Sequence, residues 1–376
     1  MSEFLLQPDV YKTGCCNNLL GLLENVWIHP NHFGRGTYYL LSGFGNYNGG
    51  VRFFSTFKRH VDSGGRVVSF FGGSTSQRLT SAQLVERLLD CGCEVYIVNR
   101  KRLFHTKCYG KTADTENNLI VTSGNFTGVG MSQNVESAIY LDTEATAHIS
   151  FRWSDLEQSI LQQRWDIYRP ALADRQAPAW SLLFDEYEER IGLDETQFMT
   201  MVIILGHSDT ARINADPGTV QGRGTQYFWL SKDCYDFFPP LTVLNERGYK
   251  TTNSCLINLH YVELGIVDRG SRVTFEAGNN VDFRFGTPKY RHTKLARPGD
   301  LAVISRISEH DYEIRIVHSG TPEFSILAPY AITFIGHQGK RIGYLSNDKL
   351  EQEFGIHLPT PQEFNSLPTS ESTDPD

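Results

Sequence analysis

The chain has 376 residues, of which 40% are hydrophobic and 21% charged, and its formal net charge at pH 7 is −8. This length suits two domains of ordinary size, and the composition is that of a soluble globular protein. The negative total argues against a nucleic-acid-binding surface over the whole molecule, although binding depends on local patches rather than on totals.

Several other classes are disfavoured by simple patterns. No apolar run approaches the length that spans a membrane, and the first ten residues carry Glu3 and Asp9 where a signal peptide would be basic. We therefore expect a cytoplasmic protein that does not bind membranes. The seven cysteines form no Cys-x-x-Cys pair and the histidines no His-x-x-x-His, so we expect reduced structural thiols, no metal site and no cofactor.

In the first half, apolar runs typical of strands alternate with amphipathic patterns typical of helices. Strands are expected at 37–44, 65–73, 93–99, 102–110, 118–125 and 136–142, and helices at 49–64 and 81–92. This alternation predicts an α/β layered sheet with helices packed outside it. A helix within 154–172 is expected to close this domain, which we place at residues 1–170.

The strongest chemical signal is the pair His105 and Lys107, followed by Asn125 in the segment Ser-Gly-Asn. Residues i and i+2 of a strand project to the same face, so the imidazole and the ammonium lie together. An imidazole can attack phosphorus or transfer a proton, while an ammonium and an amide can stabilise phosphoryl oxygens. Glu136, on the next expected strand, can hold the imidazole tautomer or orient Lys107. The alternatives are a hydrogen-bonded core histidine and an edge-strand carboxylate.

This set resembles the HKD motif of the phospholipase D superfamily. The aspartate of that motif has no counterpart, because the residues from Tyr109 to Thr112 follow the lysine and Asp114 comes later, in a loop. In the superfamily each active site needs two such motifs, and this chain has one. The resemblance therefore implies a homodimer whose two-fold axis brings two copies of His105 together. It also implies a phosphohistidine mechanism without a metal and places Glu136 at the site.

Residues 171–195 are expected to form an acidic linker, since 185–195 hold six acids against a single base, Arg190. Such a run is commonly a solvated connection. A sharper hypothesis is that it lies across a cationic cleft and competes there with substrate phosphates.

From residue 196 the chain consists of short strand-like runs separated by Gly, Pro, Asn and Asp turns. This pattern predicts an all-β barrel or sandwich at 196–358. The tail at 359–376 is rich in Pro, Ser and Thr and has no Lys or Arg, which predicts disorder.

The second half strengthens the resemblance through the segments 224–240, 256–261, 272–287 and 326–347. With 23–27, 42–53 and 123–134 of the first half, they resemble BfiI-type restriction endonucleases. In that family a phospholipase-D-like nuclease domain precedes a B3-like pseudobarrel that binds DNA. The resemblance implies a barrel that grips the major groove of double-stranded DNA with two arms.

Arginine can pair with guanine, asparagine with adenine, and lysine with phosphate. The expected DNA-binding residues are Arg212, Thr225, Trp229, Arg247, Asn253, Arg272, Asn279 and Lys340. Each has a plainer interpretation, because surface arginines are usually solvated and Trp229 is by burial tendency a core aromatic.

These patterns favour a metal-independent, sequence-specific restriction endonuclease, a phosphodiesterase that acts as a homodimer beside a cognate DNA methyltransferase. Three alternatives remain open. One is a nuclease subunit that requires a separate ATP-dependent translocase. Another is a DNA-binding regulator that does not cleave. The third is a lipid hydrolase of the phospholipase D type, which the expected DNA-binding barrel disfavours.

Overall fold

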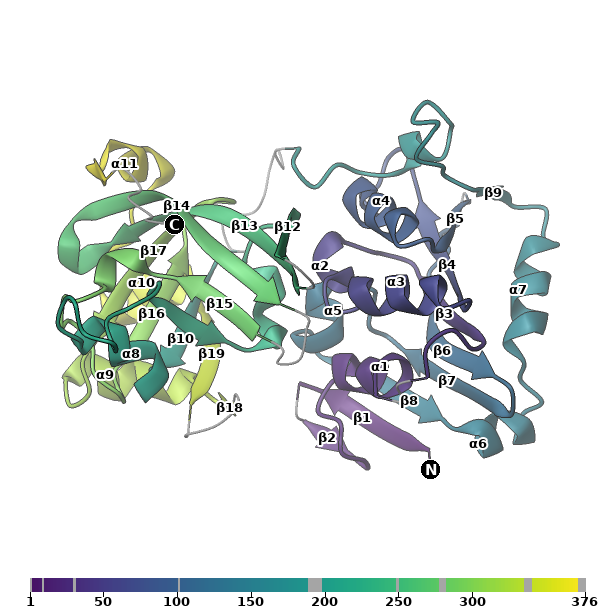
Figure 1. Cartoon of the computed structure of the whole chain (residues 1–376), viewed down its shortest axis with the longest axis horizontal. Coiled ribbons are helices and arrows are strands. Elements are labelled where there is room, and N and C mark those ends of the chain that lie inside the picture. Colours follow the sequence, from purple (N-terminus) through teal and green to yellow (C-terminus); the bar gives the residue numbers. More distant parts are fainter. Residues whose placement is uncertain are drawn as a thin grey trace. The chain divides into compact units, whose positions relative to one another are not determined.

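The computed structural model describes residues 2–8, 10–29, 32–100, 102–188, 198–247, 250–276, 282–334 and 340–370. The chain forms two compact units, Met1–Glu188 and Glu189–Asp376 (Figure 1). The described helices include none that is both long enough and apolar enough to cross a membrane.

The first unit is built on a mixed sheet with the strand order β2-β1-β8-β7-β6-β3-β4-β5-β9. Its central strands β3, β4 and β5 are parallel, and β6, β7 and β8 continue the sheet in antiparallel pairs. The strand bounds are β1 Glu3–Gln7, β2 Tyr11–Lys12, β3 Thr37–Ser42, β4 Arg66–Gly73, β5 Glu94–Asn99, β6 Lys107–Ala113, β7 Glu116–Thr122, β8 Glu136–Leu141 and β9 Asp166–Tyr168.

Helices cover both faces of this sheet, as the alternating side chains of β3 illustrate. Tyr38 packs on Trp27 of α1, with ring centroids 6.3 Å apart, whereas Tyr39 stacks on Trp153 of α7 at 4.7 Å. Neighbouring strand residues point to opposite faces, so α1 and α7 lie on opposite sides. The helix bounds are α1 Leu19–Trp27, α2 Tyr47–Gly50, α3 Phe54–Asp62, α4 Ala82–Asp90, α5 Gly128–Ser132, α6 Thr143–His148 and α7 Trp153–Leu161.

The expected layered α/β sheet is confirmed, and the structure differs from the expectation in local details. The strand expected at 102–110 begins only at Lys107, so His105 lies in the preceding loop and not on the strand. The single helix expected at 49–64 is divided into α2 and α3. The helix expected within 154–172 ends at Leu161, after which β9 pairs with β5 at the sheet edge. This pairing buries part of Ile167 and Trp165 against the core, which the helical pattern of the sequence does not reveal.

Much of the expected linker packs against the first unit. Residues Trp180–Leu182 form a 3₁₀ helix in which Leu182 is buried, and the backbone of Phe184 bridges to Ser81 at the start of α4. The part of this linker at 189–195 lies outside the described residues.

The second unit is all-β in character, as expected, with the strand order β11-β15-β14-β13-β17-β16-β10-β19-β18 and with β12 and β20 added to β13 and β14. The strands are β10 Met199–Ile204, β11 Tyr227–Leu230, β12 Val243–Arg247, β13 Lys250–Tyr261, β14 Ile266–Glu276, β15 Asp282–Gly286, β16 Leu301–Arg306, β17 Asp311–Val317, β18 Thr333–Phe334, β19 Arg341–Ser346 and β20 Thr369–Ser370. Short helices lie between them: α8 His207–Asn214, α9 Pro322–Leu327, α10 Asn347–Phe354, α11 Pro361–Ser366, and 3₁₀ helices at Lys232–Phe237, Val262–Leu264, Pro288–Tyr290 and Ala328–Tyr330.

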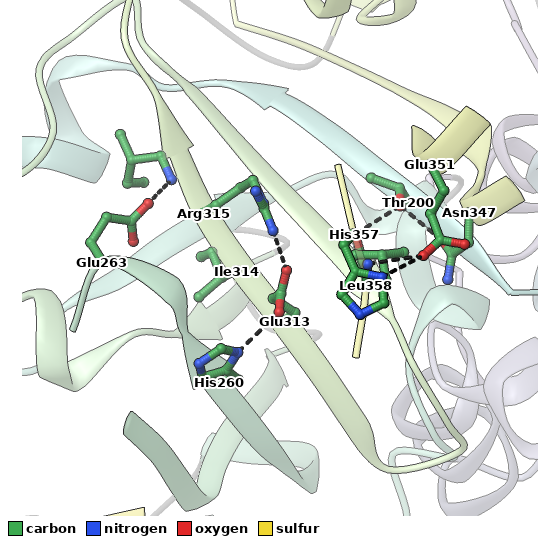
Figure 2. Close-up of polar contacts among 12 residues, drawn as sticks. Thr200, His260, Glu263, Glu313, Ile314, Arg315, Asn347, Glu351, His357 and Leu358 are labelled. Carbon is green, nitrogen blue, oxygen red and sulfur yellow. Dashed lines mark hydrogen bonds and ion pairs between the residues drawn. The ribbon is translucent and has the colours of Figure 1, made fainter. Parts of the chain in front are cut away.

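A buried ionic group supports the parallel pairing of β13 with β17. The Glu313 carboxylate accepts hydrogen bonds from His260 Nδ1 at 3.0 Å and from Arg315 Nη2 at 2.5 Å (Figure 2). His260 and Glu313 are register partners on the two strands. Because a buried carboxylate is costly unless it is hydrogen-bonded, these two donors account for its place in the sheet.

The disorder expected for 359–376 does not hold for the part of this tail that the structure describes, which ends at residue 370. Glu351 of α10 accepts a hydrogen bond from the Leu358 backbone at 3.0 Å (Figure 2). Beyond it, α11 places Phe364 fully inside the core, and β20 pairs with β14. Although the segment is mostly polar, burial of the large apolar side chain of Phe364 is sufficient to order it.

Candidate active site and nucleic-acid interface

Strand register brings the expected catalytic residues to one edge of the first sheet. Ser42, at the end of β3, pairs with Lys107, the first residue of β6. Thr122, at the end of β7, pairs with Ala138 near the start of β8. His105 lies two residues before the start of β6, Asn125 follows β7, and Glu136 begins β8. Four segments that are separate in sequence therefore end at a common edge.

The Lys107 ammonium lies against the His105 imidazole. Its Nζ atom is 3.0 Å from His105 Nδ1, 2.9 Å from Nε2 and 3.1 Å from the His105 carbonyl oxygen. Lys107 is only 8% exposed, whereas His105 is exposed. A solvent-accessible ring is thus held beside a largely buried cation.

A glycine allows the loop after β3 to approach this ring. A Cβ atom placed on Gly43 would lie 2.9 Å from the Phe104 carbonyl oxygen and 3.1 Å from His105 Cδ2. Any other residue would therefore push the loop and the histidine apart. The next residue, Phe44, presents its ring edge-on to the imidazole at 5.7 Å, which limits the orientations open to His105.

The surroundings lower the pKa values of both groups, which favours the neutral imidazole of His105 but opposes the charge on Lys107. Burial and the neighbouring Lys107 ammonium lower the pKa of His105, so its ring is neutral near pH 7. Burial also lowers the pKa of Lys107, and the Glu136 carboxylate opposes that effect. A neutral imidazole has a free lone pair for attack on phosphorus, and a cation beside it can stabilise the phosphoryl oxygens.

Asn125 is oriented by the same loop that supports His105. Its Oδ1 atom accepts a hydrogen bond from the Phe44 amide at 3.2 Å. With the oxygen engaged in this way, the NH₂ group is the part of the side chain left to donate. Asn125 is half-buried and fits the expected role of a donor to a phosphoryl oxygen.

Glu136 lies at the site but makes different contacts from those expected. Ser123 Oγ donates to Glu136 Oε2, and Asn134 Nδ2 donates to Oε1 at 3.3 Å. The carboxylate thus acts on Lys107 through its charge, and within the described part of the chain it makes no hydrogen bond to the imidazole. Ser123, which sequence reasoning missed, holds Glu136 in place and lies within the Ser-Gly-Asn segment already singled out.

Asp114 is not part of this site. It lies between β6 and β7 with φ of 45°, and the register pairs Thr112 with Asn117 beside that turn. The strands β6 and β7 run from the catalytic edge to this opposite end. The aspartate of the superfamily motif therefore has no spatial replacement in Asp114.

The acidic segment after Phe184 contacts the loops next to the catalytic edge. Glu186 Oε1 accepts from the Tyr47 backbone amide at 2.7 Å, three residues after Phe44. Asp185 Oδ1 accepts from Gln83 Nε2 at 2.6 Å, and Arg78 donates to the Asp185 carbonyl oxygen at 2.7 Å. Two of the six acids are thus fixed on the first unit rather than solvated.

In the second unit, three of the expected DNA-binding residues lie near one aromatic cluster. Arg212 of α8 stacks over Tyr227, 5.2 Å from the ring centroid. Arg284 lies over Tyr227 at 5.2 Å and over Trp229 at 5.4 Å. Trp229 is half-exposed rather than a core residue, and Thr225, just before β11, is exposed. This cluster presents cations and ring faces together, a combination suited to nucleic acid.

Arg247 and Arg272 lie on strands: Arg247 ends β12, and Arg272 is an exposed residue of β14. Asn279 lies outside the described residues. Whether Arg247, Arg272 and Asn279 contact bases therefore stays a prediction from the sequence.

Two of the expected DNA-binding residues are instead internal. Asn253 is 4% exposed, so its amide faces the protein and not a base edge. Lys340 is 8% exposed and donates to both carboxylate oxygens of Asp209 at 2.8 Å. Burial lowers the pKa of Lys340, and Asp209 opposes this shift. Lys340 therefore joins α8 to the segment before β19, and a phosphate would have to displace Asp209 to reach it.

Comparison with known proteins distinguishes the two halves. Residues 193–357 match the family described as "Metal-independent restriction enzyme BfiI DNA binding domain". None of the curated proteins matches the chain.

The first half resembles several solved structures. Nuc, a phospholipase D family member from Salmonella typhimurium, is 13% identical and covers 45% of this chain and 99% of its own, with a TM-score of 0.32. NucT from Helicobacter pylori is 12% identical and covers 43% of this chain and 96% of its own, with a TM-score of 0.32. Polyphosphate kinase from Porphyromonas gingivalis is 13% identical over 46% of this chain and 27% of its own, with a TM-score of 0.33.

Proposed function

Because residues 193–357 belong to the family of DNA-binding domains of the metal-independent restriction enzyme BfiI, we propose that the chain is a site-specific endonuclease of double-stranded DNA. The observation that carries this proposal is the neutral His105 ring held against the Lys107 ammonium, in a chain whose other unit binds DNA. The catalytic function is thus assigned to the first unit and target recognition to the second.

The mechanism we propose proceeds in two displacements and needs no metal. His105 of one subunit attacks phosphorus and forms a P–N bond while the bond from phosphorus to the 3′ oxygen breaks. His105 of the other subunit donates its proton to that leaving oxygen. It then removes a proton from water, which attacks phosphorus and releases the first histidine. Lys107 and Asn125 of both subunits stabilise the phosphoryl oxygens.

Exposed apolar side chains at the catalytic edge support a homodimer. Leu103 lies two residues before His105, Val129 lies on α5 just beyond Asn125, and Val135 precedes Glu136. All three are exposed, and a backbone hydrogen bond of 2.9 Å from Asn134 to Val129 brings two of them close. Apolar groups gathered around a polar site mark an interaction surface. A second copy on this edge would bring the two His105 rings together.

The decisive experiment combines plasmid cleavage with trapping of the intermediate. The proposal predicts discrete fragments in EDTA and an acid-labile phosphoryl group on His105 in quenched reactions. The variant His105→Ala should lose at least roughly a hundredfold in cleavage rate and keep its DNA affinity. Complete loss of cleavage in the chelator, restored by magnesium, would refute the mechanism.

The same experiment separates the alternative functions. DNA retention without any cleavage would support a regulator, and cleavage only after addition of a translocase and ATP would support a subunit of a larger system. Protection of the cleaved site by methylation would support the proposed pairing with a cognate methyltransferase in the cytoplasm.

A further inference from the structure

A second group of reactive side chains lies in the first unit, away from the residues assigned to catalysis. Glu3, Cys15 and Cys16 place a carboxylate oxygen and two sulfur atoms within 4.8 Å of one another. Glu3 belongs to β1, whereas the cysteines belong to the segment between β2 and α1. This convergence is tertiary, because the carboxylate and the thiols are more than ten residues apart.

The local backbone allows the three donors to meet. The chain bends at residues 13–15, so two adjacent cysteines can turn their side chains toward one point instead of opposite faces. A Cβ atom on Gly14 would lie 1.8 Å from Glu3 Oε2. Only glycine therefore leaves room for the carboxylate to approach the thiols.

We propose that Glu3, Cys15 and Cys16 bind a thiophilic divalent cation, with Zn²⁺ the chemically favoured ion. Two thiolates and a carboxylate are ordinary zinc ligands. The fourth ligand would be a water molecule or the carbonyl oxygen of Asn25, whose amide group lies 3.1 Å from Cys16 Sγ. Binding releases the two thiol protons to solvent. The proposed site departs from the sequence-based expectation of no metal site and is independent of the proposed nuclease function.

Solvent can reach this group of ligands. Of the seven cysteines, which the structure describes in full, Cys15 is the one classed as exposed, so an ion has an access route from solvent.

The bound ion would brace the N-terminal part of the unit. It would connect β1 to the segment that leads into α1. The other end of β1 already contacts α1 and α5 through the side chain of Gln7. Gln7 Oε1 accepts a hydrogen bond from the Leu19 amide at 2.6 Å, and Gln7 Nε2 donates one to the Gly130 carbonyl oxygen at 3.1 Å. Its role would be structural, and it would contact no phosphate.

The test measures metal binding and thiol protection in the full chain. After loading with Zn²⁺ and removal of excess metal, we expect one zinc ion per chain by elemental analysis and slower alkylation of Cys15. Alkylation of the half-buried Cys108 in the same sample is the internal reference. Loading with Co²⁺ should give the thiolate charge-transfer band of a tetrahedral site.

Variants identify the ligands. Cys15→Ser, at an exposed position that should not disturb folding, should lose the zinc and the band. Glu3→Gln should weaken zinc binding by at least roughly tenfold. Removing a residue that only supports a metal ligand already costs about tenfold to a hundredfold in affinity. Glu144→Gln, at an exposed glutamate of the same unit, is the matched control. Zinc retained unchanged in Cys15→Ser, or no zinc and unaltered Cys15 alkylation in the parent chain, would overturn the proposal.

Discussion

After burial, the Lys107 ammonium is the second cause that lowers the pKa of His105, and it also supplies charge to the proposed phosphate site. The ammonium is 8% exposed and lies 2.9 Å from the ring, so protonating the imidazole would place two cations side by side. That repulsion favours the neutral ring. In a dimer the two imidazoles must hold different protonation states, so cleavage should fall at both pH extremes.

Replacing Lys107 by methionine should raise the pKa of His105. The neighbouring cation now lowers that pKa, and its removal lets the ring bind a proton at higher pH. The acidic side of the curve of cleavage rate against pH should likewise shift to higher pH. The measurement is an NMR titration of the His105 ring. Lys107→Arg keeps the charge and is the control, and an unchanged His105 pKa in the methionine variant would contradict this account.

At the scale of single elements, the segment around Glu186 and the helix α11 make specific contacts that their polar composition does not predict. Glu186 accepts a hydrogen bond from the Tyr47 backbone amide, three residues after Phe44, and backbone amides are donors that phosphate oxygens also accept from. This contact supports the hypothesis that the acidic segment competes with substrate, since both ligands are anionic. The helix α11 closes the core of the second unit through Phe364.

Glu186→Gln should increase cleavage of non-cognate DNA. A hydrogen bond to a charged group contributes about 1.5–3 kcal/mol, so we expect an increase of roughly tenfold to a hundredfold in the non-cognate rate. Glu188→Gln is the matched control, because Glu188 is an exposed acid whose ion pair with Arg78 spans 4.0 Å. Equal rates of non-cognate cleavage in the two variants would refute the hypothesis that the acidic segment competes with substrate.

Phe364→Ala should destabilise the second unit by about 3–5 kcal/mol, the usual cost of removing a buried phenyl ring. Gln362→Ala, at an exposed position of the same helix, should have little effect. Urea unfolding followed by tryptophan fluorescence measures the difference in the free energy of unfolding. Equal stability of the two variants would show that α11 does not contribute to the core.

At the scale of the whole molecule, the proposed activity depends on association of two chains. One chain supplies one His105, and the proposed chemistry needs a nucleophile and an acid. The exposed apolar residues at the catalytic edge provide a surface on which a second copy can close the site.

Val135→Asp should convert the dimer to monomers and abolish cleavage, because association would bury the new charge. Val135 is 72% exposed. Ile149→Asp is the control, because Ile149 is 59% exposed and follows α6. This helix begins beside the β6–β7 turn, at the end of the strands opposite the catalytic edge. Light scattering coupled to size-exclusion chromatography gives the mass. A monomeric parent chain, or a dimeric Val135→Asp variant, would contradict the proposed interface.

The sequence by itself determined the fold classes and the catalytic candidates, because periodicity decides which strands form and which residues share a face. The spacing of His105 and Lys107 identified them as a pair, but β6 begins at Lys107 and His105 lies in the loop before it. The contact between the two side chains therefore depends on the conformation of that loop and not on strand alternation. The segment around Asn125 is recognisable for its turn residues, and the match of residues 193–357 to a DNA-binding domain family agrees with the resemblance found in the second half of the sequence.

Only the tertiary structure decided burial and long-range partners. Asn253 and Lys340 have the chemistry of DNA contacts, yet packing encloses one and Asp209 engages the other. Phe364 orders a tail whose composition indicates disorder, and Glu3 meets Cys15 and Cys16 across the chain. Local sequence patterns describe neighbours along a strand or helix, whereas these outcomes depend on which distant side chains the folded backbone brings into contact.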